Sequence, residues 1–351
     1  MSSPIPVKNI YYLLAYAWDR LPESEVTDVS AMDSTELADL FAAVLAGGIH
    51  HLLRRGLDQN YISHEEEIAG VRGRINIGVT ARRMLVSHGR TYCEFDELSV
   101  DTLPNQILRA TVRRLLKAPK LDAELRGSLR GLTRELGGIS DIPLTKHAFR
   151  TVQLHGNNRY YRFLLNICEL VLDMALVDEE EGDYKFRDFI RDDKAMARLF
   201  EAFIRNFYAK ERPDLNIRSE NIAWQATSQS DPDLLFLPNM RTDISVRDKP
   251  HTKTLIIDAK FYRQTFQKYY EKETIHSANL YQLASYLQNL EVRDGPDSVA
   301  DGMLLYPVVK DPVRLSYELN GHRVRICTIN LAADWQDIRK ELCGLVGNIG
   351  G

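Results

Sequence analysis

An Asp-x-Lys triplet follows an apolar segment in the second half of the chain. Leu255, Ile256 and Ile257 form the kind of run that a buried strand carries, and Asp258 and Lys260 come directly after it. Successive side chains of a strand point to opposite faces, so the carboxylate of Asp258 and the ammonium of Lys260 share one face. The alternative interpretation is a surface ion pair at a strand end, which contributes little energy and has no catalytic role.

A second carboxylate is expected beside the first. Asp243 lies in a β-prone segment, residues 241–246, and a turn expected at 247–250 makes that segment an antiparallel neighbour of the strand that ends at Asp258. Asp243 can then face Asp258 across the two strands.

Two other acidic residues compete for a place in this site. Asp233 follows Pro232, and spacing alone does not exclude it; we prefer Asp243 because a polar run, 227–230, precedes Asp233. Glu201 lies on a helix predicted over 196–207 and could supply a further carboxylate to a metal, although a solvent-facing position fits the pattern at least as well.

Carboxylates at the ends of adjacent strands form a hard-oxygen site of the kind that Mg²⁺ prefers, with water and substrate phosphate oxygens completing its shell. Such a metal neutralises a phosphodiester and activates water, while Lys260 can stabilise the attacking hydroxide or the charge of the transition state. This is the logic of the D-(D/E)-x-K nucleases. The triplet alone is a weak signal, and its support comes from the apolar strand before it, Asp243 upstream and a helix downstream.

That downstream helix carries Gln282 and Tyr286 one turn apart on one face. The pair resembles the Q-x-x-x-Y element of one branch of these nucleases, where it supports the catalytic lysine and touches the nucleic acid. Without the Asp-x-Lys strand ahead of it, Tyr286 would read as a core residue of an amphipathic helix.

The length of 351 residues favours two domains of roughly 150 to 200 residues each. We expect an N-terminal helical domain with a small inserted β unit, residues 1–152, and a C-terminal domain with a mixed sheet flanked by helices, residues 153–351. Helices are expected over 10–21, from 34 to 53, over 103–136, 161–175, 193–210 and 277–290, and strands within 61–98 and over 234–237, 241–246, 254–261, 302–308 and 323–331.

Composition excludes several classes of function. The net charge of −4 gives no global case for nucleic-acid binding, so any DNA contact must be local. Four scattered cysteines without a C-x-x-C pair indicate reduced thiols rather than a zinc site or disulfides. No Walker-type motif, long apolar span or leader pattern is present, so we expect a cytoplasmic protein that neither binds GTP by a P-loop nor enters a membrane.

Two basic stretches stand out locally and are candidates for contact with a partner or DNA. Residues 72–90 hold five arginines and no acid, and a helix within 102–121 aligns three cations on one face. A solvated or protein-contacting surface is an equally good interpretation. The residues proposed for contact are Arg72, Arg74, Arg82, Arg83, Arg109, Arg113 and Lys117.

Motifs spread over nearly the whole chain resemble the McrC family, the nuclease subunit of the McrBC modified-cytosine restriction system. The resemblance is carried by 5–12 (IPVKNIYY), 70–75 (GVRGRI), 101–105 (DTLPN), 237–244 (LPNMRTDI), 256–262 (IIDAKFY) and 276–282 (HSANLYQ). It implies a PD-(D/E)xK endonuclease domain in which Asp243, Asp258 and Lys260 are the catalytic set and Asp243 and Asp258 bind Mg²⁺.

The resemblance also implies a partner. McrC proteins work with McrB, a hexameric AAA+ GTPase that binds the GTP and reads the modified cytosine in double-stranded DNA, and their N-terminal part inserts into the hexamer and stimulates GTP hydrolysis. The basic segment 72–90 would then contact the motor's channel. A homodimer through the nuclease domain would suit double-strand cutting. The alternative is an interaction protein that mainly activates a AAA+ motor and carries an idle nuclease site.

Overall fold

A computed structural model describes residues 5–19, 37–154, 159–177, 184–186, 193–262, 267–269, 272–308, 313–347 and 349. The chain divides into two compact units, one formed by residues 1–37 with 187–351 and the other by residues 38–186. We call them unit 1 and unit 2.

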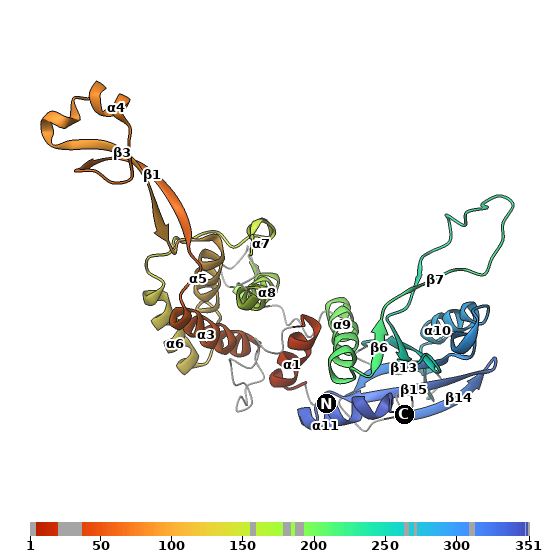
Figure 1. Ribbon diagram of the computed structural model, residues 1–351. Helices are drawn as coiled ribbons and strands as arrows, with labels where there is room; N and C mark the ends of the chain where they lie inside the picture. The colour runs from red at the N-terminus through yellow and green to blue at the C-terminus, as the bar shows by residue number, and fades with distance from the viewer. Residues whose placement is uncertain are drawn as a thin grey trace. The chain divides into compact units, whose positions relative to one another are not determined.

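Unit 1 is built on a six-stranded mixed sheet (Figure 1). β10 (Thr254–Ala259), β13 (Asp301–Val308) and β15 (His322–Asn330) run parallel, and their neighbours are antiparallel to them. The order is β14 (Arg314–Leu319), β15, β13, β10, β9 (Ile244–Asp248) and β6 (Leu215–Arg218). The expected mixed sheet is therefore confirmed, with β6 and β14 as edge strands that the sequence pattern did not predict.

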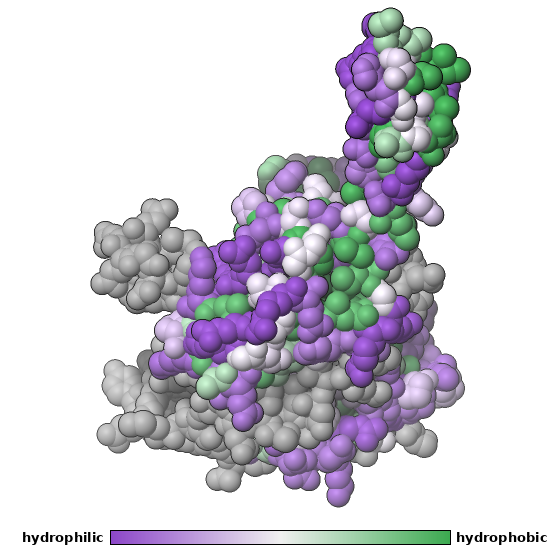
Figure 2. Space-filling model, turned by 90° about the vertical axis from the view of Figure 1, so that its left-hand side faces the viewer, coloured by the Kyte–Doolittle hydropathy of each residue, from purple (hydrophilic) through white to green (hydrophobic). Residues whose placement is uncertain are grey.

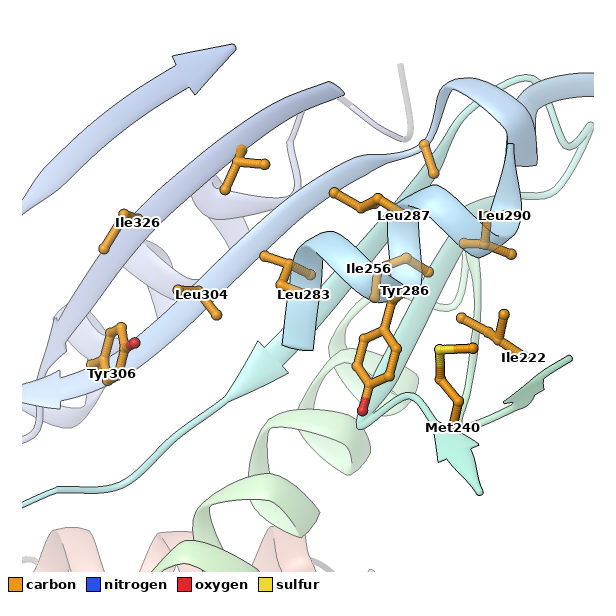
Figure 3. Close-up of a cluster of buried hydrophobic side chains, with 12 residues drawn as sticks. Ile222, Met240, Ile256, Leu283, Tyr286, Leu287, Leu290, Leu304, Tyr306 and Ile326 are labelled. Atoms are coloured by element: carbon orange, nitrogen blue, oxygen red, sulfur yellow. The ribbon is translucent and has the colours of Figure 1, made fainter. Parts of the chain in front are cut away.

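One face of this sheet is covered by α10 (Ser277–Leu290), which lies in the connection between the parallel strands β10 and β13. Leu283, Tyr286 and Leu287 of the helix pack with Ile256, and Figure 3 shows this cluster between helix and sheet. A Cβ added to Gly302 of β13 would lie 2.9 Å from the end of the Leu287 side chain, so a larger residue there would displace that side chain of α10.

Three further helices of unit 1 pack together through aromatic rings. They are α1 (Val7–Ala17), α9 (Asp193–Glu211) and α11 (Trp335–Leu345). The ring of Tyr16 lies 5.9 Å from Phe203 and 5.6 Å from Trp335, and the Tyr16 hydroxyl donates to Glu211 at 2.6 Å. α9 also contacts β6 and β10, so this cluster joins the first helix of the chain to the sheet.

The compact units do not follow the boundary expected at residue 152. Asn9 of α1 donates to the carbonyl oxygens of Leu331 and Ala333, at 2.8 and 2.9 Å. These bonds place the first helix in the same unit as the C-terminal sheet, and the unit boundary near the middle of the chain falls at 186–187. Short-range periodicity could not reveal a contact across more than 320 residues.

Unit 2 combines helices with a projecting finger, residues 60–99 (Figure 1). β1 (Asn60–Ala69) pairs antiparallel with β3 (Arg90–Ser99), and β2 (Arg74–Ile75), α4 (Ile77–Arg82) and η1 (Leu85–His88) lie between them. This is the small β unit that the sequence predicts. Gly73 has a φ of +66°, and a Cβ there would lie 2.4 Å from the Glu94 carbonyl, so this turn requires glycine.

The base of the finger is fixed by Asn105 of α5 (Leu103–Leu115). Its amide donates to the carbonyl oxygens of Asp58 and Val100, at 2.9 and 2.7 Å, which lie just before β1 and just after β3. Tyr161 of α8 (Arg159–Met174) donates to the Asn105 side chain at 2.6 Å. One buried amide thus ties both ends of the finger to the helices.

The remaining elements of unit 2 are mostly helical. They are α3 (Leu37–Arg55), α6 (Ala123–Glu135), α7 (Lys146–Thr151), β4 (Ala175–Val177) and β5 (Tyr184–Phe186). α3 is long and apolar enough to be considered as a membrane span, but most of it is buried inside the unit. We interpret it as a core helix. The helix expected over 103–136 is two helices, α5 and α6.

One predicted strand is wrong. Residues 234–237 form turns instead, within a long loop that follows β7 (Asn221–Ile222) and ends at β8 (Met240–Arg241) (Figure 1). The carboxylate of Asp231 accepts hydrogen bonds from the backbone nitrogens of Leu235 and Phe236. A side chain that satisfies the backbone in this way stabilises a turn, and it leaves Phe236 92% exposed.

Candidate active site

The two aspartates meet where β9 begins and β10 ends. Ile244 of β9 pairs with Ile257 of β10, so the next residues outward, Asp243 and Asp258, lie opposite each other. This is the antiparallel arrangement predicted from the sequence. β9 runs to Asp248, so the connecting turn begins slightly later than the expected 247–250.

Lys260 lies between the two carboxylates. Its Nζ is 3.0 Å from Oδ1 of Asp258 and 3.8 Å from Oδ2 of Asp243. Its backbone nitrogen donates to the Leu305 carbonyl oxygen at 3.0 Å, which extends the pairing of β10 with β13 by one residue. Asp243 Oδ2 also accepts from the backbone nitrogen of Ala259 at 3.0 Å. The three charged groups therefore form one fixed cluster.

Burial dominates the electrostatics of this cluster. The side chain of Asp258 is 0% exposed, and burial raises its pKa although the Lys260 ammonium opposes the shift. Burial and the neighbouring charge of Asp258 raise the pKa of Asp243 to about 6. For Lys260, burial lowers the pKa, but the two aspartates outweigh it and the net shift is upward. An additional cation would relieve the strain between the two carboxylates.

The donor set fits a hard divalent cation. Within the described residues, neither carboxylate oxygen of Asp258 accepts a hydrogen bond of ordinary geometry, and the Lys260 ammonium lies close without the direction of one. No three His, Cys, Asp or Glu side chains gather closely enough to form a complete protein cage in that part of the chain. Two carboxylates with water and a substrate oxygen are the usual ligands of Mg²⁺.

Tyr286 and Gln282 support the strand that leads to Asp243. The Tyr286 hydroxyl donates to the Arg241 carbonyl oxygen at 2.8 Å and accepts from Nε2 of Gln282, also at 2.8 Å. Burial and the charges of Asp258 and Asp243 raise the pKa of Tyr286 to about 12. The tyrosine is both a core residue, as Figure 3 shows, and a neighbour of the carboxylates. Its anchor on a main-chain carbonyl left no signal in the sequence.

The competing acids have different surroundings. Asp233 lies exposed in the turn after Asp231, outside the strands that carry the other aspartates. Glu201 of α9 is half-buried and pairs with Arg205 at 3.2 Å. Burial and the charge of Asp243 raise the pKa of Glu201. Glu201 is thus close enough to the cluster to interact with it electrostatically.

The proposed contact arginines fall into two groups. In the finger, the guanidinium of Arg72 lies 4.3 Å from the centre of the Phe95 ring and that of Arg83 lies 5.5 Å from the Tyr92 ring, while Arg82 is exposed. In α5, Arg109 donates to the carbonyl oxygens of residues 136 and 137 after α6, and Arg113 pairs with Asp141. The α5 face therefore serves internal contacts, which favours a structural role for Arg109 and Arg113. Arg74 and Lys117 are also exposed.

The finger presents apolar as well as hydrophilic side chains to solvent (Figure 2), and its exposed side chains include Arg72, Arg74, Arg82 and Arg83. Ile77, Met84 and Val86 are each at least 70% exposed at its tip. A surface of mixed aliphatic and cationic groups on a projecting element is typical of a protein-binding site.

The sequence matches a family model and a known protein over most of its length. The family model described as McrBC 5-methylcytosine restriction system component matches residues 7–307. The Type IV methyl-directed restriction enzyme EcoKMcrBC of Escherichia coli (strain K12) is 38% identical over 338 residues, which cover 96% of each chain.

A solved structure shares the fold. It is a half-complex from a tetradecameric assembly of Thermococcus gammatolerans McrB AAA+ hexamers with bound McrC, and the match has a TM-score of 0.64 at 19% identity, covering 98% of this chain and 76% of that one. The family match and the long alignment identify the chain. It belongs to the McrC family of the McrBC 5-methylcytosine restriction system.

Proposed function

We propose that this chain is the Mg²⁺-dependent DNA endonuclease subunit of a GTP-dependent, modified-cytosine-specific restriction complex. The observation that carries the proposal is the buried cluster of Asp243, Asp258 and Lys260 at the ends of two adjacent strands. In this proposal the sheet of unit 1 is a PD-(D/E)xK nuclease fold, and the substrate is double-stranded DNA in the cytoplasm.

Each residue has a role that follows from its position. Asp243 and Asp258 would hold Mg²⁺, which when bound neutralises the scissile phosphate and acidifies water. Lys260 stays charged, since its pKa is raised, and its ammonium lies where it can stabilise negative charge developing on the phosphate or on the attacking oxygen. Tyr286 and Gln282 keep the strand of Asp243 in place.

The finger of unit 2 supports the second half of the proposal. Its exposed aliphatic and basic tip suits docking on a McrB-like AAA+ hexamer, which binds GTP and reads the modified base. Docking would stimulate GTP hydrolysis. The separation of finger and cluster into different compact units allows the two activities to be tested separately.

The test is Asp258→Ala in the full chain, reconstituted with the GTPase, Mg²⁺, GTP and DNA containing modified cytosine. We expect loss of cleavage with retained stimulation of GTP hydrolysis. Cleavage that persists in this variant would refute the nuclease assignment. The alternative, an interaction protein with an idle nuclease site, predicts that even the unmodified chain stimulates the GTPase without cutting DNA.

A further inference from the structure

The main chain around Asp243 needs more support than the sheet provides. Asp243 precedes β9, and the register of β9 with β10 begins only at Ile244. The neighbouring carboxylate of Asp258 repels it, and a short shift of this peptide away from Asp258 would relieve that repulsion. Contacts that hold the main chain of residues 241–243 in place would oppose this shift.

Thr242 supplies contacts that hold this peptide. It is almost fully buried, its backbone nitrogen donates to the Glu220 carbonyl oxygen at 2.9 Å, and its Oγ1 accepts from the Glu220 backbone nitrogen at 3.1 Å. Its carbonyl oxygen accepts from Oγ of Ser219 at 2.5 Å. We call Ser219, Glu220 and Thr242 the Thr242 clamp.

The clamp is itself anchored in buried charge. The Glu220 carboxylate pairs with Arg247 at 2.7 Å and with Arg293 at 3.4 Å. Arg247 is buried and also forms a two-bond ion pair with Asp297, at 2.9 and 2.8 Å. Separating a buried ion pair strongly destabilises the folded protein, because it leaves an uncompensated charge. Glu220 therefore has little freedom to move away from Arg247.

Two side chains therefore donate hydrogen bonds to the two consecutive carbonyl groups that precede Asp243. Tyr286 donates to the carbonyl of Arg241, and Ser219 donates to the carbonyl of Thr242. Nε of Arg241 also donates to Oγ of Ser219 at 2.9 Å. Functional side chains must be held to about 0.5 Å for catalysis, and supporting hydrogen bonds commonly provide that precision.

We propose that Ser219, Glu220 and Thr242 are positioning residues that hold Asp243 against Asp258, so that the two carboxylates are spaced to bind one divalent cation together. This proposal rests on the proposed function, because it assigns the clamp to the metal site of the nuclease. In this proposal the three residues act through the main chain that leads to residue 243.

The test compares Thr242→Val, which removes the hydroxyl at nearly constant volume, with Thr242→Ser, which keeps it. Binding of Mn²⁺ to the full chain is measured by the EPR signal of free Mn²⁺, alongside thermal unfolding and cleavage by the reconstituted complex at varied Mg²⁺. We expect Thr242→Val to weaken Mn²⁺ binding about tenfold to a hundredfold and Thr242→Ser to stay within about twofold. Ser219→Ala should weaken it about tenfold.

Thr328→Val is the matched control. Thr328 is buried in β15, and its hydroxyl accepts from the Val313 backbone nitrogen at 2.6 Å, so the same change removes a similar hydrogen bond elsewhere in the sheet. We expect a lowered melting temperature with unchanged Mn²⁺ binding. Equal Mn²⁺ binding by Thr242→Val and the unmodified chain would overturn the proposal, as would equal losses in Thr242→Val and Thr328→Val. If Thr242→Val does not fold, the same comparison is made with Ser219→Ala: Mn²⁺ binding equal to that of the unmodified chain would overturn the proposal.

Failure of the proposed function has a different signature. If the unmodified chain and Asp258→Ala bind Mn²⁺ equally and the complex cuts no DNA, the metal site itself is wrong. If Asp258→Ala loses Mn²⁺ while Thr242→Val and Ser219→Ala keep it, only the clamp is wrong.

Discussion

The strand-end cluster of unit 1 and the finger of unit 2 both concentrate charge, but they hold it differently. Asp243, Asp258 and Lys260 are largely buried, and the Lys260 ammonium lies within 3.8 Å of both carboxylates. The finger arginines are exposed, and Arg82 projects from a short helix into solvent. Buried charges are costly unless something compensates them, whereas exposed charges cost little and are free to meet a partner.

In the proposed function this difference separates the charges that do chemistry from those that recognise a partner surface. A buried cluster with a shifted pKa stores an unfavourable interaction that ligand binding relieves, which is typical of a functional site. A projecting cationic and aliphatic tip suits association with another protein. Substitutions in either region should therefore affect one activity and leave the other unchanged.

The largest effect is expected at Lys260. Lys260→Ala should lower the cleavage rate by about 10² to 10³-fold, because it removes a preorganised cation from the site of developing charge. Stimulation of the partner's GTP hydrolysis should not change. Lys340→Ala, an exposed lysine of α11, is the control and should cut normally. Cleavage within a factor of two of the control would show that Lys260 is only a structural ion pair.

Asp243→Asn should stabilise the metal-free protein at pH 7. The folded pKa of Asp243, about 6, lies above the usual aspartate value, so the folded state prefers the proton and loses stability as pH rises from about 4 to about 6. The neutral amide removes this loss, on the order of 1 to 3 kcal/mol at pH 7. Urea unfolding of the variant and the parent at pH 4 and pH 7 in EDTA measures this difference in the free energy of unfolding. A variant that is less stable than the parent at pH 7 contradicts the assigned repulsion.

Substitutions in the finger should weaken binding of the partner and leave the metal site unchanged. Arg82→Glu combined with Arg74→Glu should weaken association with the GTPase about tenfold or more, since it reverses charge on an exposed docking surface. Mn²⁺ binding at the strand-end cluster should stay unchanged. The control is Arg130→Glu combined with Arg150→Glu, two exposed arginines of α6 and α7 in the same unit, which change the net charge by the same amount. Titration by surface plasmon resonance compares them, and equal weakening by the control would mean that only net charge matters.

The smallest effect is expected at Arg113. Its ion pair with Asp141 is half-exposed, so Arg113→Ala should change the free energy of unfolding by less than about 1 kcal/mol. It should also leave GTPase stimulation unchanged, because this helix face serves internal contacts. A marked loss of stimulation would restore the α5 cations as a partner surface.

The sequence by itself determined the catalytic candidates and the elements that carry them. The apolar run before Asp258, the alternation that puts Lys260 on the same face, and the turn that returns Asp243 are local patterns, and a strand of period two obeys them wherever it packs. The helix of Gln282 and Tyr286 followed for the same reason, from spacings of three and four residues.

Only the tertiary structure decided the rest. The place of the first helix depends on Asn9 bonding to Leu331, and the exposure of Phe236 depends on a turn stabilised by Asp231. The position of Thr242 depends on a hydrogen bond from the backbone nitrogen of Glu220, which lies 22 residues earlier in the chain. These contacts use backbone groups and distant partners, which leave no periodic trace in a sequence, because any residue type offers the same carbonyl and amide.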